Sequence, residues 1–185
     1  MRRYPRTVLA LAVGLGFWWM SGCNLGALLP TEAVNFPLQG SLGTFDVQSG
    51  VPVTNKGTLN FDPKGITLGR GSLQLTPDAI SVVPADSGGG KVGQALQETS
   101  ELEITVWADS PEAIDTVCET GDQYGPYTIT LDENLEPVSI SPNTLTLTEK
   151  TIGLLNDGQL SVCVEVVSPV TGQVVVDSLR FNLGL

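Results

Sequence analysis

The sequence contains no histidine. Histidine is the usual general base near neutral pH and the commonest protein ligand of metal ions, so its absence excludes a His-containing catalytic triad and a His-ligated metal. Basic residues are also scarce, because nine Lys and Arg oppose 20 Asp and Glu and the formal net charge is −11. A chain this acidic repels phosphate backbones and anionic headgroups, and we therefore expect no nucleic-acid partner.

Long apolar runs are limited to the N-terminus. Arg2, Arg3 and Arg6 precede an uncharged apolar run of 13 residues, Val8 to Met20, which is followed by Ser21-Gly22-Cys23. The run is shorter than the ~20 residues that a membrane-spanning helix needs. A basic start, a short apolar stretch and small residues before a cleavage point are typical of a secretory signal peptide.

Residues 1–23 resemble the signal peptides of bacterial lipoproteins, whose lipobox ends in a small residue and a cysteine. The matching segment is Met20-Ser21-Gly22-Cys23, with Met20 where that family usually has leucine. The resemblance implies removal of residues 1–22 and acylation of Cys23, and two or more acyl chains anchor a protein stably. Asn24, in place of Asp, implies the outer membrane where the cell has one. The alternative is an ordinary cleaved signal.

Three cysteines are present, and a lipidated Cys23 leaves Cys118 and Cys163 as a pair in an oxidising compartment. We predict a disulfide between them. They are 45 positions apart, so closing this loop is worth about 4 kcal/mol by chain entropy. A zinc site would lack ligands, and a catalytic cysteine would lack a histidine. Because Cys163 alternates with core positions, the bridge should pin a loop to the outside of a sheet.

The organisation after Cys23 is predicted to be a lipidated tether over residues 23–40 and a single domain over residues 41–185. Short segments rich in Val, Ile, Leu and Thr alternate with polar residues and are interrupted by Gly, Pro, Asn and Asp. This pattern is typical of an all-β protein, and we expect an antiparallel β-sandwich, immunoglobulin-like or related.

Individual strands follow from the alternation. Glu101 to Trp107 is the most regular, with Leu102, Ile104 and Val106 on its core face. The pattern apolar-x-apolar-x-Pro-x-x-apolar-x-apolar occurs three times, at 59–68, 73–82 and 138–147, and each copy predicts a hairpin with a proline turn.

The C-terminal part is predicted to contain a strand at 144–148, a short helical turn at 149–155 and a long hairpin formed by 160–167 and 173–183. A strand, a helical corner and a closing hairpin resemble the last three strands of immunoglobulin-like domains. This resemblance covers residues 138–183. The antibody-type arrangement is absent, because Ser161 stands where a tyrosine would precede Cys163 by two positions.

Acidic residues are concentrated between Lys91 and Lys150, a stretch of 58 residues with twelve carboxylates and no basic side chain. Several carboxylates that converge from a loop can bind Ca²⁺, which takes six to eight oxygen ligands. The alternatives are solvated acidic edges that prevent sheet pairing, or a carboxylate pair that hydrolyses glycosides. The candidate calcium ligands are Asp109, Glu112, Asp115, Glu119 and Asp122.

Trp107 is a candidate binding residue, because strand alternation places it on the polar face of its strand. An aromatic side chain there can contact a sugar or a partner protein, with Tyr124 and Tyr127 expected nearby. The alternative is that Trp107 packs under a neighbouring loop.

The sequence therefore favours a lipid-anchored envelope β-sandwich of a non-catalytic binding, adhesion or structural type. The expected partners are the membrane, through the lipid, and an envelope protein or polysaccharide. We expect no cofactor, apart from Ca²⁺ if the five carboxylates converge. The alternative functions are a calcium-dependent binding module and a carbohydrate-active hydrolase.

Overall fold

The computed structural model describes residues 32–62, 67–85 and 100–185. Within these ranges nearly every segment with alternating apolar and polar residues is a β-strand. No helix in this part of the chain is long and apolar enough to cross a membrane. The predicted signal peptide, Cys23 and the predicted tether up to residue 31 lie outside the described residues.

The strands form three antiparallel sheets, which we name A, B and C. Sheet A has the order β1-β12-β4-β9, sheet B has the order β2-β11-β5, and sheet C has the order β3-β10-β6-β7-β8. The strands are β1 (Glu32–Pro37), β2 (Thr44–Val47), β3 (Pro52–Asn60), β4 (Arg70–Gln74), β5 (Ile80–Pro84), β6 (Ser100–Asp109), β7 (Asp122–Leu131), β8 (Pro137–Ser141), β9 (Thr144–Thr146), β10 (Gln159–Val167), β11 (Gly172–Val176) and β12 (Ser178–Gly184). The helices are α1 (Val117–Thr120) and α2 (Glu149–Asp157), with short 3-10 turns η2 (Gly40–Leu42), η3 (Pro77–Ala79) and η4 (Pro111–Ala113).

Sheets A and B are two halves of one layer, because three stretches of chain run from one into the other. β1 continues into β2 through η2, β4 into β5 through η3, and β11 into β12 at Asp177. The points where these three stretches pass between the sheets are hydrogen-bonded to each other. Asp177 donates its N–H to the Ala79 carbonyl, and Val176 donates its N–H to the Gly43 carbonyl, both at 2.8 Å. A Cβ at Gly43 would lie 2.5 Å from the Val176 carbonyl oxygen, so this close approach requires glycine.

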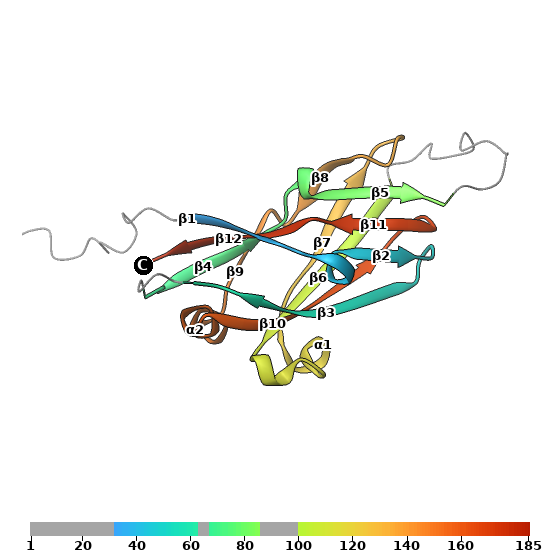
Figure 1. Ribbon diagram of the computed structural model, residues 1–185. Helices are drawn as coiled ribbons and strands as arrows, with labels where there is room; N and C mark the ends of the chain where they lie inside the picture. Colours follow the sequence, from blue (N-terminus) through green and yellow to red (C-terminus); the bar gives the residue numbers. More distant parts are fainter. Residues whose placement is uncertain (1–31, 63–66, 86–99) are drawn as a thin grey trace, which may run out of the picture.

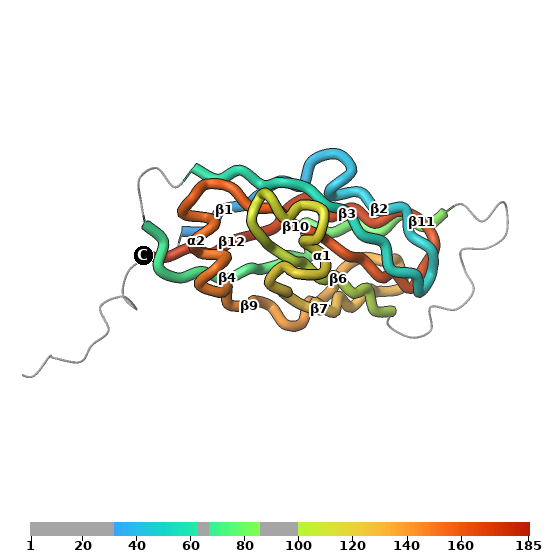
Figure 2. The backbone as a smooth tube through the Cα atoms, turned by 90° about the horizontal axis from the view of Figure 1, so that it is seen from below, coloured from blue at the N-terminus to red at the C-terminus, as the bar shows by residue number. Residues whose placement is uncertain are grey.

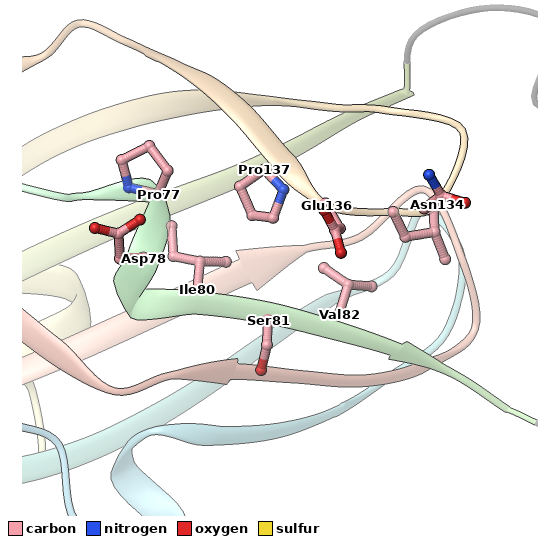
Figure 3. A pocket seen from close by; sticks show the side chains of 9 residues that line it. Pro77, Asp78, Ile80, Ser81, Val82, Asn134, Glu136 and Pro137 are labelled. Carbon is pink, nitrogen blue, oxygen red and sulfur yellow. The ribbon is translucent and has the colours of Figure 1, made fainter.

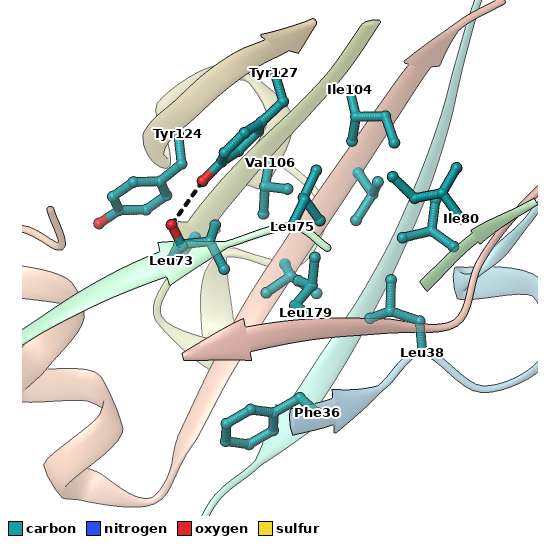
Figure 4. Close-up of a cluster of buried hydrophobic side chains, with 14 of the residues drawn as sticks. Phe36, Leu38, Leu73, Leu75, Ile80, Ile104, Val106, Tyr124, Tyr127 and Leu179 are labelled. Atoms are coloured by element: carbon teal, nitrogen blue, oxygen red, sulfur yellow. Dashed lines mark hydrogen bonds between the residues drawn. The ribbon is translucent and has the colours of Figure 1, made fainter. Parts of the chain in front are cut away.

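The A/B layer packs on sheet C, whose strands β6, β7 and β10 cross it obliquely (Figure 1). Apolar side chains from both layers fill the interior, as Figure 4 shows for part of it. Tyr127 of β7 is fully buried and donates its hydroxyl hydrogen to the Leu73 carbonyl of β4 at 3.0 Å, which links the two layers. Burial raises the pKa of Tyr127. The predicted all-β antiparallel sandwich is confirmed.

The strand predicted from residue 101 to 107 is also confirmed, within β6. Leu102, Ile104 and Val106 are buried in the core. Glu101 and Glu103 are exposed, as the alternation requires.

The three predicted proline hairpins are wrong. The strands on either side of each proline belong to different sheets: β3 and β4 to C and A, β4 and β5 to A and B, and β8 and β9 to C and A. The turn of the first copy includes residues 63–66, which lie outside the described residues. Proline has no N–H for a ladder hydrogen bond, so it is as compatible with a corner where pairing ends as with a turn where pairing begins.

The long C-terminal hairpin is also wrong. β10 pairs with β3 and β6, whereas β11 pairs with β2 and β5, so residues 168–171 carry the chain from one layer to the other. The closing hairpin implied by the resemblance to immunoglobulin-like domains is therefore absent. The predicted helical corner is present as α2, which begins after its N-cap Thr148 and ends at Gly158 with a left-handed φ of 88°.

The N-terminal boundary of the folded part is earlier than predicted. Residues 32–37, which were assigned to the tether, form β1 and pair along β12 from Glu32 opposite Leu183 to Pro37 opposite Ser178. Phe36 is buried and contacts Phe181 edge-on, with ring centroids 5.0 Å apart. The segment has too few residues to show a clear alternation, and its pairing with the distant β12 decides its structure.

Candidate functional site

The predicted disulfide is present and lies on the outside of sheet C. Cys118 of α1 and Cys163 of β10 are bonded, with their Cα atoms 5.3 Å apart. α1 contacts β10 and β6, and it lies over them in the view from below (Figure 2). Cys163 is fully buried although it points away from the core, because the connection between β6 and β7 covers it. The bridge therefore pins this connection to the sheet, as predicted.

Asp109, the first of the five candidate calcium ligands, is neutralised within the fold. It is 6% exposed, and Lys150 of α2 lies 2.6 Å from its Oδ1. The Ser110 N–H and the Thr120 hydroxyl also donate to its carboxylate, at 2.7 and 3.2 Å. Burial would raise the pKa of Asp109, but these hydrogen bonds and the charge of Lys150 outweigh it and hold that pKa below its usual value. The hydrogen bond to Asp109 likewise raises the pKa of Lys150.

Asp122 is bound to the first turn of α2. Its Oδ2 accepts hydrogen bonds from the hydroxyls of Thr148 and Thr151, the latter at 3.0 Å. Tyr124 extends this network, because its hydroxyl donates to Thr151 Oγ1 at 2.7 Å. A carboxylate at a helix N-terminus is favoured by the helix dipole. Asp122 therefore anchors α2 to the sheet.

The other three candidates point to solvent. Glu112, Asp115 and Glu119 are exposed, and it is the Asp115 backbone carbonyl that accepts a hydrogen bond, from Lys56 Nζ. Among the residues that the structure describes, no three Cys, Asp or Glu side chains lie close enough together to hold a metal ion. The five carboxylates do not converge, so the candidate calcium site has no geometric basis.

Trp107 is half-buried, on the face of sheet C that carries the disulfide. It lies directly opposite Cys163 of β10 and Gln123 of β7. Tyr124 and Tyr127 are not beside it, because both are buried on the core side, at 3% and 0% exposure. The predicted aromatic surface is therefore wrong in its tyrosines. Tyr124 follows Gln123 and points to the opposite face, and the pairing of β7 with β6 shifts register between Tyr124 and Tyr127, so Tyr127 points inward as well.

A shallow groove of about 420 Å³ runs between β5 and the turn that joins β7 to β8. In Figure 3, Ile80 and Val82 point towards Pro137 and Glu136 across the groove, while Ser81 points away. The groove also contains Asp78. Asp78 and Glu136 are both exposed, so neither lies in the desolvated setting that a glycosidase general acid requires. The groove therefore gives no support to the hydrolase alternative.

The outer face of sheet A has a different character. Its inward side chains, among them Phe36, Leu73 and Phe181, belong to the core, so the alternate positions point outward. We call the polar residues at these outward positions the polar face. They are Asn35 of β1, Ser178, Arg180 and Asn182 of β12, Arg70, Ser72 and Gln74 of β4, and Thr144 and Thr146 of β9. None of them is buried, and none is Asp or Glu.

The register places these side chains in rows across the sheet. Arg180 lies opposite Asn35 on one side and Gln74 on the other, and Gln74 lies opposite Thr144. Asn182 donates from Nδ2 to Gln74 Oε1 at 3.2 Å, which fixes the orientation of both amides. The result is a surface with many hydrogen-bond donors and acceptors and with no Asp or Glu among the residues that we assign to it.

Sequence reasoning missed the polar face. The local signal was present, because Arg70 to Gln74 and Ser178 to Gly184 alternate polar with apolar or small residues. What was absent was any indication that β4 and β12 are neighbours, since the bonded Asn182 and Gln74 are 108 positions apart.

No protein-family model, no curated protein and no solved structure matches this chain. The fold class is therefore established by the strand arrangement alone.

Proposed function

We propose that this chain is a lipid-anchored, non-catalytic binding module of the bacterial cell envelope, and that it binds an envelope polysaccharide through the polar face. The observation that carries the proposal is the composition of that face, which presents amide, hydroxyl and guanidinium groups in register and no carboxylate. Polysaccharides are rich in hydroxyl groups, which donate and accept hydrogen bonds and match such a surface.

The anchor is supported by the lipobox-type segment that ends at Cys23. Glu32, the start of β1, is nine positions after Cys23. A fully extended chain spans at most ~3.3–3.6 Å per residue, so an acylated Cys23 would hold Glu32 within about 30 Å of the membrane. Glu32 lies at the sheet A end of the sandwich, where the C-terminus also lies (Figure 1). The polar face would then be on the membrane-proximal half, close to polysaccharide of the envelope itself.

The anchor is tested on full-length protein made in a bacterial host. We expect it to partition into detergent and to carry the mass of an acylated Cys23, and Cys23→Ala should abolish both properties. An unmodified product from the native sequence would overturn the lipoprotein assignment.

The binding surface is tested with full-length protein and immobilised polysaccharide extracted from the envelope of the source bacterium. Gln74→Ala combined with Asn182→Ala removes the paired amides of the polar face and should weaken binding about tenfold, the loss expected for one to two hydrogen bonds. The control is Thr54→Ala combined with Thr58→Ala, two exposed positions on the outer side of β3 in sheet C. Equal binding by both double variants, or no binding by the native protein, would overturn the proposal.

A further inference from the structure

Arg180 is at the centre of the polar face. Its strand β12 is flanked by β1 and β4, and its row continues to β9. Within the described ranges 32–62, 67–85 and 100–185, Arg180 forms no ion pair, and it is partly exposed. A guanidinium is always charged, and its fork of N–H donors matches a planar carboxylate. An arginine placed in this way is complementary to an anionic group of a ligand.

The residues around Arg180 narrow the ligand further. Asn35, Gln74 and Asn182 are neutral, so they offer hydrogen bonds without additional positive charge. A polymer with a phosphate at every repeat needs many cations for tight binding. The chain also carries a net charge of −11, which falls to −14 when the three arginines of residues 1–22 are removed. Densely charged polyanions are therefore repelled, and a polymer with few charges and many hydroxyl groups fits best.

Resting on the proposed function, we infer that the ligand of the polar face is a carboxylate-bearing polysaccharide, in which one carboxylate pairs with the Arg180 guanidinium while neighbouring hydroxyl groups bond the amides of Asn35, Gln74 and Asn182. This inference names the chemistry of the ligand and the residue that recognises its charge.

The test uses full-length protein in detergent and three probes: hyaluronan, which has a carboxylate on every second sugar, neutral dextran, and polyphosphate. We expect binding to hyaluronan that exceeds binding to either of the other two probes. Arg180→Gln should weaken hyaluronan binding about tenfold or more, as expected for a charge-assisted hydrogen bond. Arg180→Lys keeps the charge without the fork and should fall between the two.

The matched control is Lys56→Gln, which removes the same charge from β3 of sheet C and should leave hyaluronan binding unchanged. Raising the salt concentration should weaken binding of the native protein more than that of Arg180→Gln. Far-UV circular dichroism and thermal melting establish that each variant is folded, and Arg180→Lys provides the comparison if Arg180→Gln is not.

Each alternative outcome overturns the inference. Equal affinity for dextran and hyaluronan, with Arg180→Gln unaffected, would mean that the polar face binds neutral sugar, which leaves the proposed function intact. Preference for polyphosphate would mean that the face recognises phosphate. Loss of binding in Lys56→Gln equal to that in Arg180→Gln would mean that only net charge matters.

Discussion

The outer faces of sheets C and A differ in whether other parts of the chain cover them. The connection between β6 and β7 covers part of sheet C, where the disulfide holds α1 against β10. The residues of the polar face on sheet A are partly or fully exposed and include no Asp or Glu. The candidate calcium ligands are all on or beside the β6–β7 connection. Two of them, Asp109 and Asp122, bind residues of α2. Carboxylates that suggest a metal site can therefore have a structural role. The proposed binding surface, in contrast, consists of polar residues that suggest no site individually.

The largest expected effect is on the covered face. Cys118→Ser combined with Cys163→Ala should lower the free energy of unfolding by about 4 kcal/mol, because the unfolded chain gains the entropy of an open loop. Denaturant unfolding measures this loss, and the native protein with reductant should lose a similar amount. If the two faces are independent, polysaccharide binding by the folded variant stays unchanged. Free thiols in protein isolated from the envelope would contradict the prediction.

A smaller effect is expected where α2 is attached. Thr148→Ala removes the N-cap hydroxyl, which accepts the Thr151 N–H at 3.1 Å and donates to Asp122. We expect a loss of about 1–2 kcal/mol in the free energy of unfolding, measured with denaturant. The matched control is Thr146→Ala on the polar face, where an exposed threonine should matter by less than about 0.5 kcal/mol. Equal losses in both variants would remove the distinction between the two regions.

The contribution of Asp109 to the free energy of unfolding should depend on pH. Its folded-state pKa is held below the usual 3.8, so its contribution to stability is complete above that value and is lost as pH falls through the folded pKa. The difference in unfolding free energy between the native protein and Asp109→Asn should be constant from pH 5 to 8, both values being about one unit or more above the usual Asp pKa, and should shrink below about pH 4. Glu112→Gln, at an exposed site, should show no such trend. A constant difference down to pH 2, about two units below that pKa, would refute the prediction.

The smallest effect is expected from calcium. Because the five carboxylates do not converge, millimolar Ca²⁺ should change the melting temperature no more than Mg²⁺ or monovalent salt at matched ionic strength. An increase in the melting temperature that occurs only with Ca²⁺ and disappears in Asp115→Asn would show that the acidic connection binds the ion.

The accuracy of the sequence predictions follows the range of the interactions involved. The strand over 101–107 and the helix α2 were predictable because alternation and helix ends are set by neighbouring residues. The Cys118–Cys163 bond was predictable because only two cysteines remained to pair. The proline motifs were misassigned, since a proline corner between sheets and a proline hairpin share the same local pattern. β1 was missed because only its pairing with β12 makes it a strand.

The sequence by itself determined the all-β class, the face of β6 that is buried, and the pairing of Cys118 with Cys163, because strand alternation and the cysteine count do not depend on how the strands are ordered. The tertiary structure decided which strands are neighbours. The arrangement of strands brings Asp109 and Asp122 into contact with α2. From the sequence alone, the same carboxylates were candidate calcium ligands. It also brings Arg180 beside Gln74 and Asn35 from distant parts of the chain, because sheet pairing is a non-local interaction that a strand's own pattern does not encode.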